Sequence, residues 1–276
     1  MRVITVIAAA LLLALPVAAK TLNVGPSAKY KTIDAALKAA KPGDMVSVAA
    51  GFYRVPHGVS LTSDLNNVTL QGAGADRTIL DGADSADDVV SIYAKGATVT
   101  GFTLQNATTT GACFHGDTNW GVIDHNVIIG IPYVAVRLAP CMIHAVIDHN
   151  TFVKNDQFAI SGEGGDPGTE ITNNIFYENC DESPVFRSIV TGGMVSHVTP
   201  VKYNCFWGQP NDSATAATSS TNLRVDPQLV DPPNDFHLAD GSLCIGAGQN
   251  RTDIGALGKG KNPVAESPTA KEKGGK

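Results

Sequence analysis

The segment 121–128 reads Gly-Val-Ile-Asp-His-Asn-Val-Ile, and close variants of this phrase recur at 145–152, 169–176 and 201–206. Their asparagines are spaced by 24, 24 and 30 residues and are Asn126, Asn150, Asn174 and Asn204. The earlier segment 97–104 carries the same phrase without the asparagine. A fixed period in this range indicates a repeat architecture.

Each repeat unit consists of short β-branched and aromatic runs separated by Gly, Asn, Asp and Pro, a composition typical of strands and turns. In the unit of Asn150 the three runs are 133–138, 145–147 and 151–153. No unit contains an apolar stripe long enough for a helix. The pattern therefore predicts an all-β fold, a right-handed parallel β-helix whose solenoid is built from coils of about 24 residues.

Stacking of such coils places equivalent residues about 4.8 Å apart, one strand spacing. We expect one inward column of apolar side chains, formed by Leu104, Ile128, Phe152, Phe176 and Phe206. The four asparagines would form a ladder at a turn, where stacked amides bond to one another and to the backbone. We interpret these asparagines as structural and not as ligands.

The two ends of the chain differ in composition from the repeats. Residues 1–19 have a positive start at Arg2, an apolar run and small residues before Lys20, which predicts a removable signal peptide. We therefore expect a secreted or periplasmic protein with no stable membrane insertion after signal removal. The β-helix domain would span 20–258, and 259–276, rich in Lys and Gly, would be a disordered tail.

Charge and cysteine content restrict the partners. The formal net charge of −6, which becomes −7 once Arg2 is removed, argues against nucleic acid. The odd number of cysteines leaves one thiol unpaired within the chain, and spacing alone assigns no bridge among Cys113, Cys141, Cys180, Cys205 and Cys244. No Cys-x-x-C pair is present, so a zinc site built on cysteine is not expected. We expect a monomer.

An amphipathic run precedes the repeats. Residues 30–40 predict a helix with Thr32 as its N-cap and Pro42-Gly43 as its stop, and this helix would cover the open end of the stack. Near the other end, 235–238 and 242–245 predict edge strands.

Several segments resemble a known superfamily. The run from Ala35-Ala36-Leu37 through Pro42-Gly43-Asp44 and Gly51-Phe52-Tyr53 to 68–74 (Val-Thr-Leu-Gln-Gly-Ala-Gly) is similar to the amino-terminal part of the pectate lyase-like right-handed β-helix proteins. Segments 222–227 and 253–256 are similar to a carboxy-terminal segment of secreted β-helix proteins. The resemblance spans about 21–258 and is specific for fold but weak for chemistry.

The resemblance implies that substrate lies across the outer face of the sheet formed by the first strand of each coil. These strands would be 111–115, 133–138, 157–161 and 184–189. Alternation assigns their outward residues, which are Cys113, His115, Ala135, Arg137, Ala159, Ser161 and Arg187. Ala112, Phe114, Val134, Val136, Phe158, Ile160 and Phe186 would face inward.

This outer face suggests lyase chemistry on a uronate polymer. The 24-residue register stacks Cys113, Arg137 and Ser161, and it places Arg187 about 10 Å from Arg137, two strand spacings. Two arginines at that distance suit successive carboxylates, because guanidinium pairs with carboxylate through two hydrogen bonds. Arg137 or Arg187 could neutralise the substrate carboxylate while His115 removes the adjacent proton. The alternative is that all three are ordinary surface residues.

Neighbouring residues are candidates for substrate binding: Glu163, Ser161, Asp117 and Trp120. Glu163 with Asp117 or Asp166 could instead form the facing carboxylates of a glycosidase. The aspartate-rich motifs of polygalacturonases and the Gln, Asp-pair and Arg pattern of pectin methylesterases are absent, which disfavours those two activities.

A metal site is a weaker expectation. Asp124 and Asp148 would stack one spacing apart beside His125 and His149, and such a set could bind an ion. Ca²⁺ is a possible cofactor, but the full acidic set of the calcium-dependent pectate lyases has no match here. The alternative interpretation is a surface pattern copied with the repeat.

The sequence therefore predicts an exported, carbohydrate-active protein acting on an acidic polysaccharide by β-elimination. The competing classes are a non-catalytic glycan-binding protein, which the short coils favour, and a cell-surface structural repeat protein.

Overall fold

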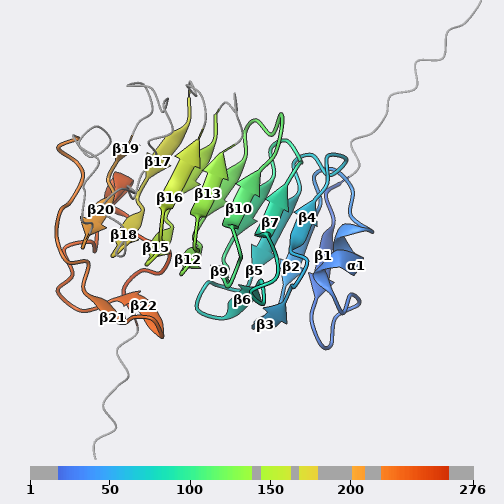
Figure 1. Ribbon diagram of the computed structural model, residues 1–276, viewed down its shortest axis with the longest axis horizontal. Helices are drawn as coiled ribbons and strands as arrows, with labels where there is room; N and C mark the ends of the chain where they lie inside the picture. The colour runs from blue at the N-terminus through green and yellow to red at the C-terminus, as the bar shows by residue number, and fades with distance from the viewer. Residues whose placement is uncertain (1–17, 139–143, 163–167, 180–200, 209–218, 261–276) are drawn as a thin grey trace, which may run out of the picture.

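The computed structural model describes residues 18–138, 144–162, 168–179, 201–208 and 219–260. Over these residues the chain winds into a stack of coils, and three parallel sheets run along its length (Figure 1). The predicted solenoid is therefore confirmed. No helix among the described residues is both long and apolar enough to cross a membrane.

Sheet A contains eight parallel strands: β1 (Thr21–Val24), β2 (Met45–Val48), β5 (Thr69–Gly72), β8 (Thr98–Thr100), β11 (Val122–Asp124), β14 (Val146–Asp148), β17 (Glu170–Thr172) and β19 (Val201–Lys202). Sheet B contains seven: β3 (Gly51–Arg54), β6 (Thr78–Asp81), β9 (Thr103–Gln105), β12 (Val127–Ile129), β15 (Thr151–Val153), β18 (Ile175–Tyr177) and β20 (Cys205–Trp207). Sheet C contains five: β4 (Val59–Leu61), β7 (Asp88–Ile92), β10 (Thr110–Phe114), β13 (Val134–Leu138) and β16 (Phe158–Gly162).

The interior is filled by columns of apolar side chains. The expected column is confirmed, because sheet B pairs Leu104 with Ile128, Ile128 with Phe152, and continues to Phe176 and Phe206. The rings of Phe152, Phe176 and Phe206 lie nearly parallel, with centroid separations of 5.0 and 4.9 Å. Stacked rings at one strand spacing fix the register of successive coils.

The asparagine ladder is also present. The Asn150 side chain accepts from the backbone N–H of Asn126, 24 residues away, and its amide donates to the carbonyls of Ile123 and Asp148. The same pattern recurs at Asn174 and Asn204, all of them fully buried. A second ladder, which the sequence analysis missed, joins Asn155 to Asn179 at another turn.

The amino-terminal helix is shorter than expected. Helix α1 (Ile33–Leu37) has five residues, and the Thr32 side chain accepts from the Ala35 N–H as predicted. It buries Ile33, Ala36 and Leu37 and packs against β1, β2 and β4. Its role as a cap over the end of the stack stays a prediction.

The carboxy-terminal segment folds back along the solenoid instead of extending it. Strands β21 (Leu229–Asp231) and β22 (Asp235–Leu238) form an antiparallel pair, and 242–245 is not a strand. A 3-10 turn, η1 (Gln249–Arg251), follows. The strand predicted at 235–238 is therefore confirmed as β22, but it pairs with β21 instead of finishing the stack, and the strand predicted at 242–245 is absent.

This back-folded segment covers the outer face of sheet B. It forms a second apolar cluster with outward side chains of β12, β15, β18 and β20, including Val127, Val153, Ile175 and Cys205. The Ala256 N–H donates to Thr151 Oγ1, and the Gly255 N–H donates to the Asn173 carbonyl. The outer face of sheet B is therefore partly closed, and the candidate site lies on sheet C.

Candidate functional site

The predicted column on the outer face of sheet C is confirmed. Backbone register pairs Ser91 with Cys113, Cys113 with Arg137, and Arg137 with Ser161. Ser60 extends the column by one strand because it pairs with Ser91. Arg137 is half-buried in the middle of this column.

Strict alternation fails in β7, β10, β13 and β16. Two successive residues face the core in β7, β13 and β16: Val89 and Val90, Ala135 and Val136, Ala159 and Ile160. In β10 the equivalent first position is Gly111, where a Cβ would lie only 2.8 Å from Ile128 Cγ2 of the core. The outward assignment of Ala135 and Ala159 is therefore wrong, because the strands bend at this position.

The same bend changes the residues before it. Phe158, predicted to face inward, is half-buried and contacts the exposed ring of Tyr133 edge-on. Asp88 belongs to the same register, since it pairs with Thr110, which pairs with Val134 and then Phe158. The Asp88 carboxylate accepts a hydrogen bond from the Ser91 hydroxyl at 2.8 Å and so reaches the outer face.

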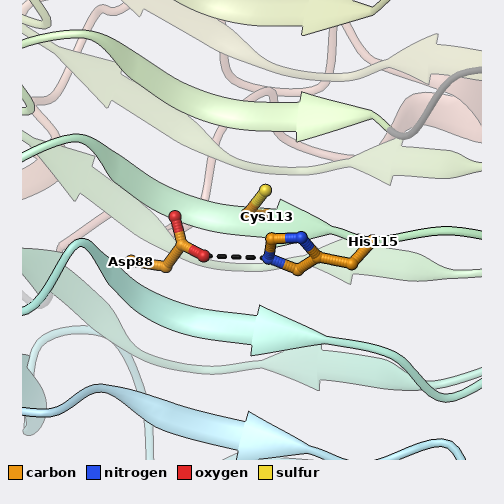
Figure 2. A group of neighbouring side chains, drawn as sticks. All are labelled: Asp88, Cys113 and His115. Atoms are coloured by element: carbon orange, nitrogen blue, oxygen red, sulfur yellow. Dashed lines mark hydrogen bonds and ion pairs between the residues drawn. The ribbon is translucent and has the colours of Figure 1, made fainter.

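His115 follows β10 and lies beside this carboxylate. Its Nε2 is 3.0 Å from Asp88 Oδ2, as Figure 2 shows. The imidazole also stacks on the Tyr93 ring at 4.5 Å between centroids, and its side chain is 34 % exposed. A carboxylate at Nε2 favours the tautomer with the proton on Nε2, which leaves Nδ1 as the proton acceptor.

Cys113 lies next to this pair but is not an activated thiol. Burial raises the pKa of Cys113 to about 12, the charge of Asp88 adds to that rise, and Arg137 opposes it. The nucleophilic form of cysteine is the thiolate. Cys113 is therefore protonated at neutral pH, and the cluster does not suit nucleophilic catalysis by sulfur.

An open pocket of about 620 Å³ lies over His115. Its wall includes Asp87, Asp88, Ser91, Tyr93, Thr109 and His115. The pocket thus exposes the histidine–aspartate pair and the aromatic ring on one surface, where a ligand on the sheet can contact all three.

The turn beyond His115 carries the other two described candidates. Asp117 pairs with Lys95 at 2.5 Å and accepts from the Asn119 amide. Trp120 is 59 % exposed, and its ring stacks on His144 with centroids 4.0 Å apart. Arg187 and Glu163 lie outside the described residues, so their predicted roles remain predictions.

The two aspartate–histidine pairs of sheet A differ: among the described residues Asp124 Oδ1 is buried without a hydrogen-bond partner, whereas Asp148 is fully bonded within the protein. Asp148 pairs with His149 at 2.7 Å and also accepts from Thr172 and Asn173. The His125 and His149 rings stack at 4.8 Å, and His149 Nε2 lies 3.0 Å from Thr252 Oγ1 of the back-folded segment. The carboxylate of Asp148 is therefore occupied by protein donors.

Among the described residues, one group of three side chains could hold a metal ion: Asp88, Cys113 and His115, whose donor atoms all lie within 4.8 Å of one another (Figure 2). One carboxylate is too few for Ca²⁺, which takes six to eight oxygen ligands. Mixed sulfur, nitrogen and oxygen donors suit Zn²⁺ better. The absence of a Cys-x-x-Cys pair in the sequence does not bear on this set, because its donors come from two coils.

The sequence analysis missed Asp88 and Tyr93. Tyr93 was missed because its coil is shorter: the residues that pair at the turn, Lys95 and Asp117, are 22 apart instead of 24. Asp88 was missed because alternation places it on the inner face. A one-coil alignment of Ser91 with Cys113 would have indicated Tyr93 opposite His115.

No protein-family model matches the sequence, and no curated protein matches it. Solved structures are similar in fold. An alginate lyase of the PL6 family, AlyGC, is 18 % identical with a TM-score of 0.51; the match covers 71 % of this chain but only 30 % of that enzyme. An alginate lyase from Paenibacillus sp. is 16 % identical with a TM-score of 0.43, and the match covers 75 % of this chain and 82 % of that enzyme. A pectin methylesterase from carrot is 14 % identical with a TM-score of 0.38, and the match covers 68 % of this chain and 72 % of that enzyme.

These identities are low, so the similarity concerns the fold. The chain spans about a third of the PL6 lyase, the structure with the highest TM-score of these three. Its parallel sheets, its coil length and this similarity agree with one another. The protein is a right-handed parallel β-helix.

Proposed function

We propose that this protein is an exported, carbohydrate-active β-helix enzyme that cleaves an acidic, uronate-containing polysaccharide by β-elimination. The observation that carries the proposal is the His115–Asp88 pair, which opens to a pocket beside the column of Arg137. The similarity in fold to an alginate lyase is consistent with this reaction but shows the fold alone.

The polymer would lie across the strands of sheet C, along the axis of the solenoid. Arg137 would pair with the carboxylate of one sugar through two hydrogen bonds and withdraw its charge. Neutralising that carboxylate makes the carbon next to it more acidic. Arg187, predicted to lie two coils beyond Arg137, would hold a second carboxylate. Ser161 and Glu163 would contact the sugars between the two arginines.

His115 would be the general base. Its Nδ1 takes the proton from the carbon next to the carboxylate, the electron pair forms a carbon–carbon double bond, and the bond to the leaving glycosidic oxygen breaks. That oxygen takes a proton from water. Asp88 holds the ring in position and stabilises the imidazolium, and the Tyr93 ring adds a cation–π contact.

Asp117 and Trp120 would bind sugars at the rim. An exposed aromatic ring offers an apolar face to the C–H groups of a sugar. Trp120 is held by its stack on His144, and Asp117 is held by Lys95, so both are oriented before ligand binds.

The experiment is an absorbance assay for the unsaturated uronate product. The full mature chain is incubated with polygalacturonate, alginate or glycosaminoglycans, with and without Ca²⁺. We expect signal on one polymer, a loss of kcat of about 100-fold or more in His115→Gln, and a rise in KM together with a lower kcat in Arg137→Ala. Arg54→Ala, an exposed arginine on sheet B, is the matched control and should be unchanged.

The second candidate function is non-catalytic glycan binding. The pocket over His115 is open to solvent, which favours binding without catalysis. Silence of wild type in the absorbance assay, with retention on an immobilised polymer that Arg137→Ala loses, would select this function. Silence in both assays would reject both candidates.

A further inference from the structure

Two cysteines meet beneath the back-folded carboxy-terminal segment. Cys205 lies in β20 of the last described coil, and Cys244 lies between β22 and η1. Both are fully buried and belong to the apolar cluster that joins this segment to sheet B. The two are separated by 39 positions in sequence, so only the folding back of the chain brings them together.

Their thiols are in direct contact. The two side chains hydrogen-bond to each other, and Cys205 Sγ also donates to the Val225 carbonyl at 3.3 Å. The mutual hydrogen bond and burial raise the pKa of Cys205, whereas the same hydrogen bond lowers the pKa of Cys244. The two thiols are therefore adjacent in the folded chain.

The backbone on both sides is fixed. β20 pairs with β18, and Cys205 also forms a bridge with Leu223. The Cys244 N–H donates to Ser242 Oγ, and the Cys244 carbonyl accepts from the Ile254 N–H. Both sulfurs are thus held in one apolar site, which limits the rearrangement that a covalent bond between them would need.

We propose that Cys205 and Cys244 form a disulfide in the exported protein, which locks the carboxy-terminal segment onto the last coil. This inference rests on the export part of the proposed function and not on lyase activity. Exported chains meet an oxidising compartment, where disulfides persist.

The reaction balances with a disulfide-bearing oxidant. One of the two cysteine thiolates attacks the oxidant and forms a mixed disulfide, and one oxidant thiol leaves. The other cysteine then loses its proton, attacks the first cysteine's sulfur and releases the second oxidant thiol. Two protons and two electrons pass from the protein to the oxidant. Because both sulfurs are buried in the folded chain, the exchange takes place before the segment docks.

The remaining described cysteine is not a competitor. Cys113 lies on the outer face of sheet C beside Asp88 and His115, whereas the thiol pair lies on the outer side of sheet B. A disulfide between Cys205 and Cys244 therefore does not compete with Cys113. Cys141 and Cys180 lie outside the described residues.

The test is peptide mapping of the mature full-length chain refolded with glutathione and oxidised glutathione, then alkylated before reduction. We expect a linked peptide that joins Cys205 to Cys244 and an alkylated Cys113. Reduction should lower the midpoint of thermal unfolding by about 5 to 15 °C. Cys205→Ala/Cys244→Ala should lose this sensitivity to reductant, and Cys113→Ala should retain it.

Two results would overturn the proposal. One is alkylation of both Cys205 and Cys244 without reduction in chain that has refolded, as judged by circular dichroism. The other is a linked peptide that joins either of them to Cys141 or Cys180. The absorbance assay is run on the same samples, so an inactive protein with the expected disulfide would count against the lyase alone.

Discussion

Each buried asparagine of the ladder replaces hydrogen bonds that a turn would otherwise leave unmade. Asn150 accepts from the Asn126 backbone and donates to two carbonyls, and its neighbours repeat the pattern one coil away. Buried polar groups are tolerated when they are fully bonded. The ladder therefore holds the coils in register at a turn where the core cannot.

Asp148 makes the free energy of unfolding depend on pH in the acid range. Burial raises the pKa of Asp148, but hydrogen bonds from His149, Thr172 and Asn173 outweigh burial, so the pKa lies below the ordinary 3.8. A carboxyl with a lowered folded pKa stabilises the protein above its unfolded pKa and loses that contribution as pH falls through the folded pKa. Thr172→Val should therefore reduce the free energy of unfolding by about 1 kcal/mol at neutral pH.

The difference between Thr172→Val and wild type should shrink as the pH falls through the lowered folded pKa of Asp148, where the carboxylate becomes protonated. Urea unfolding over a pH series measures it. Thr98→Val, on the same face of sheet A, is the control. An equal loss at all pH values would show that Thr172 acts through packing instead of through the carboxylate.

Zinc should inhibit the proposed enzyme. Asp88, Cys113 and His115 offer three donors of the types that zinc prefers, and an ion bound there would occupy the proton-accepting histidine. Cys113→Ser should weaken zinc binding about tenfold or more and relieve the inhibition, because the thiolate is the strongest of the three ligands. Metal analysis after gel filtration measures binding independently of activity. Equal zinc retention by wild type and Cys113→Ser would contradict this site.

For single residues, the sequence predicts the outward position of those that follow the 24-residue repeat and misses the position of those that depart from it. The column of Cys113, Arg137 and Ser161 follows from the 24-residue register alone. Asp88 does not, because two inward residues follow it where alternation allows one. A local bend of the backbone is set by packing across coils, which a single strand pattern does not contain.

The strands of sheet C bend together, and that bend creates the site. Strands β7, β13 and β16 each turn two successive residues into the core, and β10 has Gly111 at the first of these positions. All four strands then resume their outward face at Ser91, Cys113, Arg137 and Ser161. At Gly111 the neighbouring strand comes so close that an added Cβ would lie 2.6 Å from the Ala135 carbonyl oxygen. The element that carries Cys113 and leads into His115 thus requires glycine at its second position.

Gly111→Ala should therefore disturb fold and site together. Contacts below 3.0 Å force β10 or β13 to move, and overpacking of this kind costs about 1 to 3 kcal/mol. We expect lower stability in urea and a larger fall in lyase activity than stability alone explains, since β10 positions His115. Gly162→Ala on β16, where the nearest atom is Leu138 Cβ at 3.3 Å, is the milder control. Equal effects of both variants would contradict this assignment.

The strand pattern of these elements was predictable, but the carboxy-terminal elements were not. The repeats fix which runs pair, because each must meet its own copy one coil away. After Phe206 only Asn222 and Leu223 continue the pattern, and the runs 235–238 and 242–245 were expected to finish the stack as edge strands. Instead, 235–238 forms β22 and pairs with β21, and their segment covers the apolar outward side chains of sheet B.

At the scale of the whole molecule, the back-folded segment contributes to stability through Phe236. This side chain is only 6 % exposed and packs in the cluster with Val127, Val153 and Ile175. Phe236→Ala should lower the free energy of unfolding by about 3 kcal/mol, the range of a buried phenylalanine truncation. Phe52→Ala, 60 % exposed on sheet B, should change it little. Urea unfolding compares the two, and similar losses would mean that the segment is only loosely held.

A solenoid whose coils touch only their neighbours can open one coil at a time from either end. Here the segment 223–258 touches several coils at once: Gly255 bonds to the turn of Asn173, Ala256 to Thr151, and its cluster includes Ala75 near the other end. Before the last coil can unfold, the back-folded segment, which contacts much of the stack, must therefore be released. The protein should consequently unfold as one cooperative unit, in contrast to the gradual unravelling of a repeat array without such a segment.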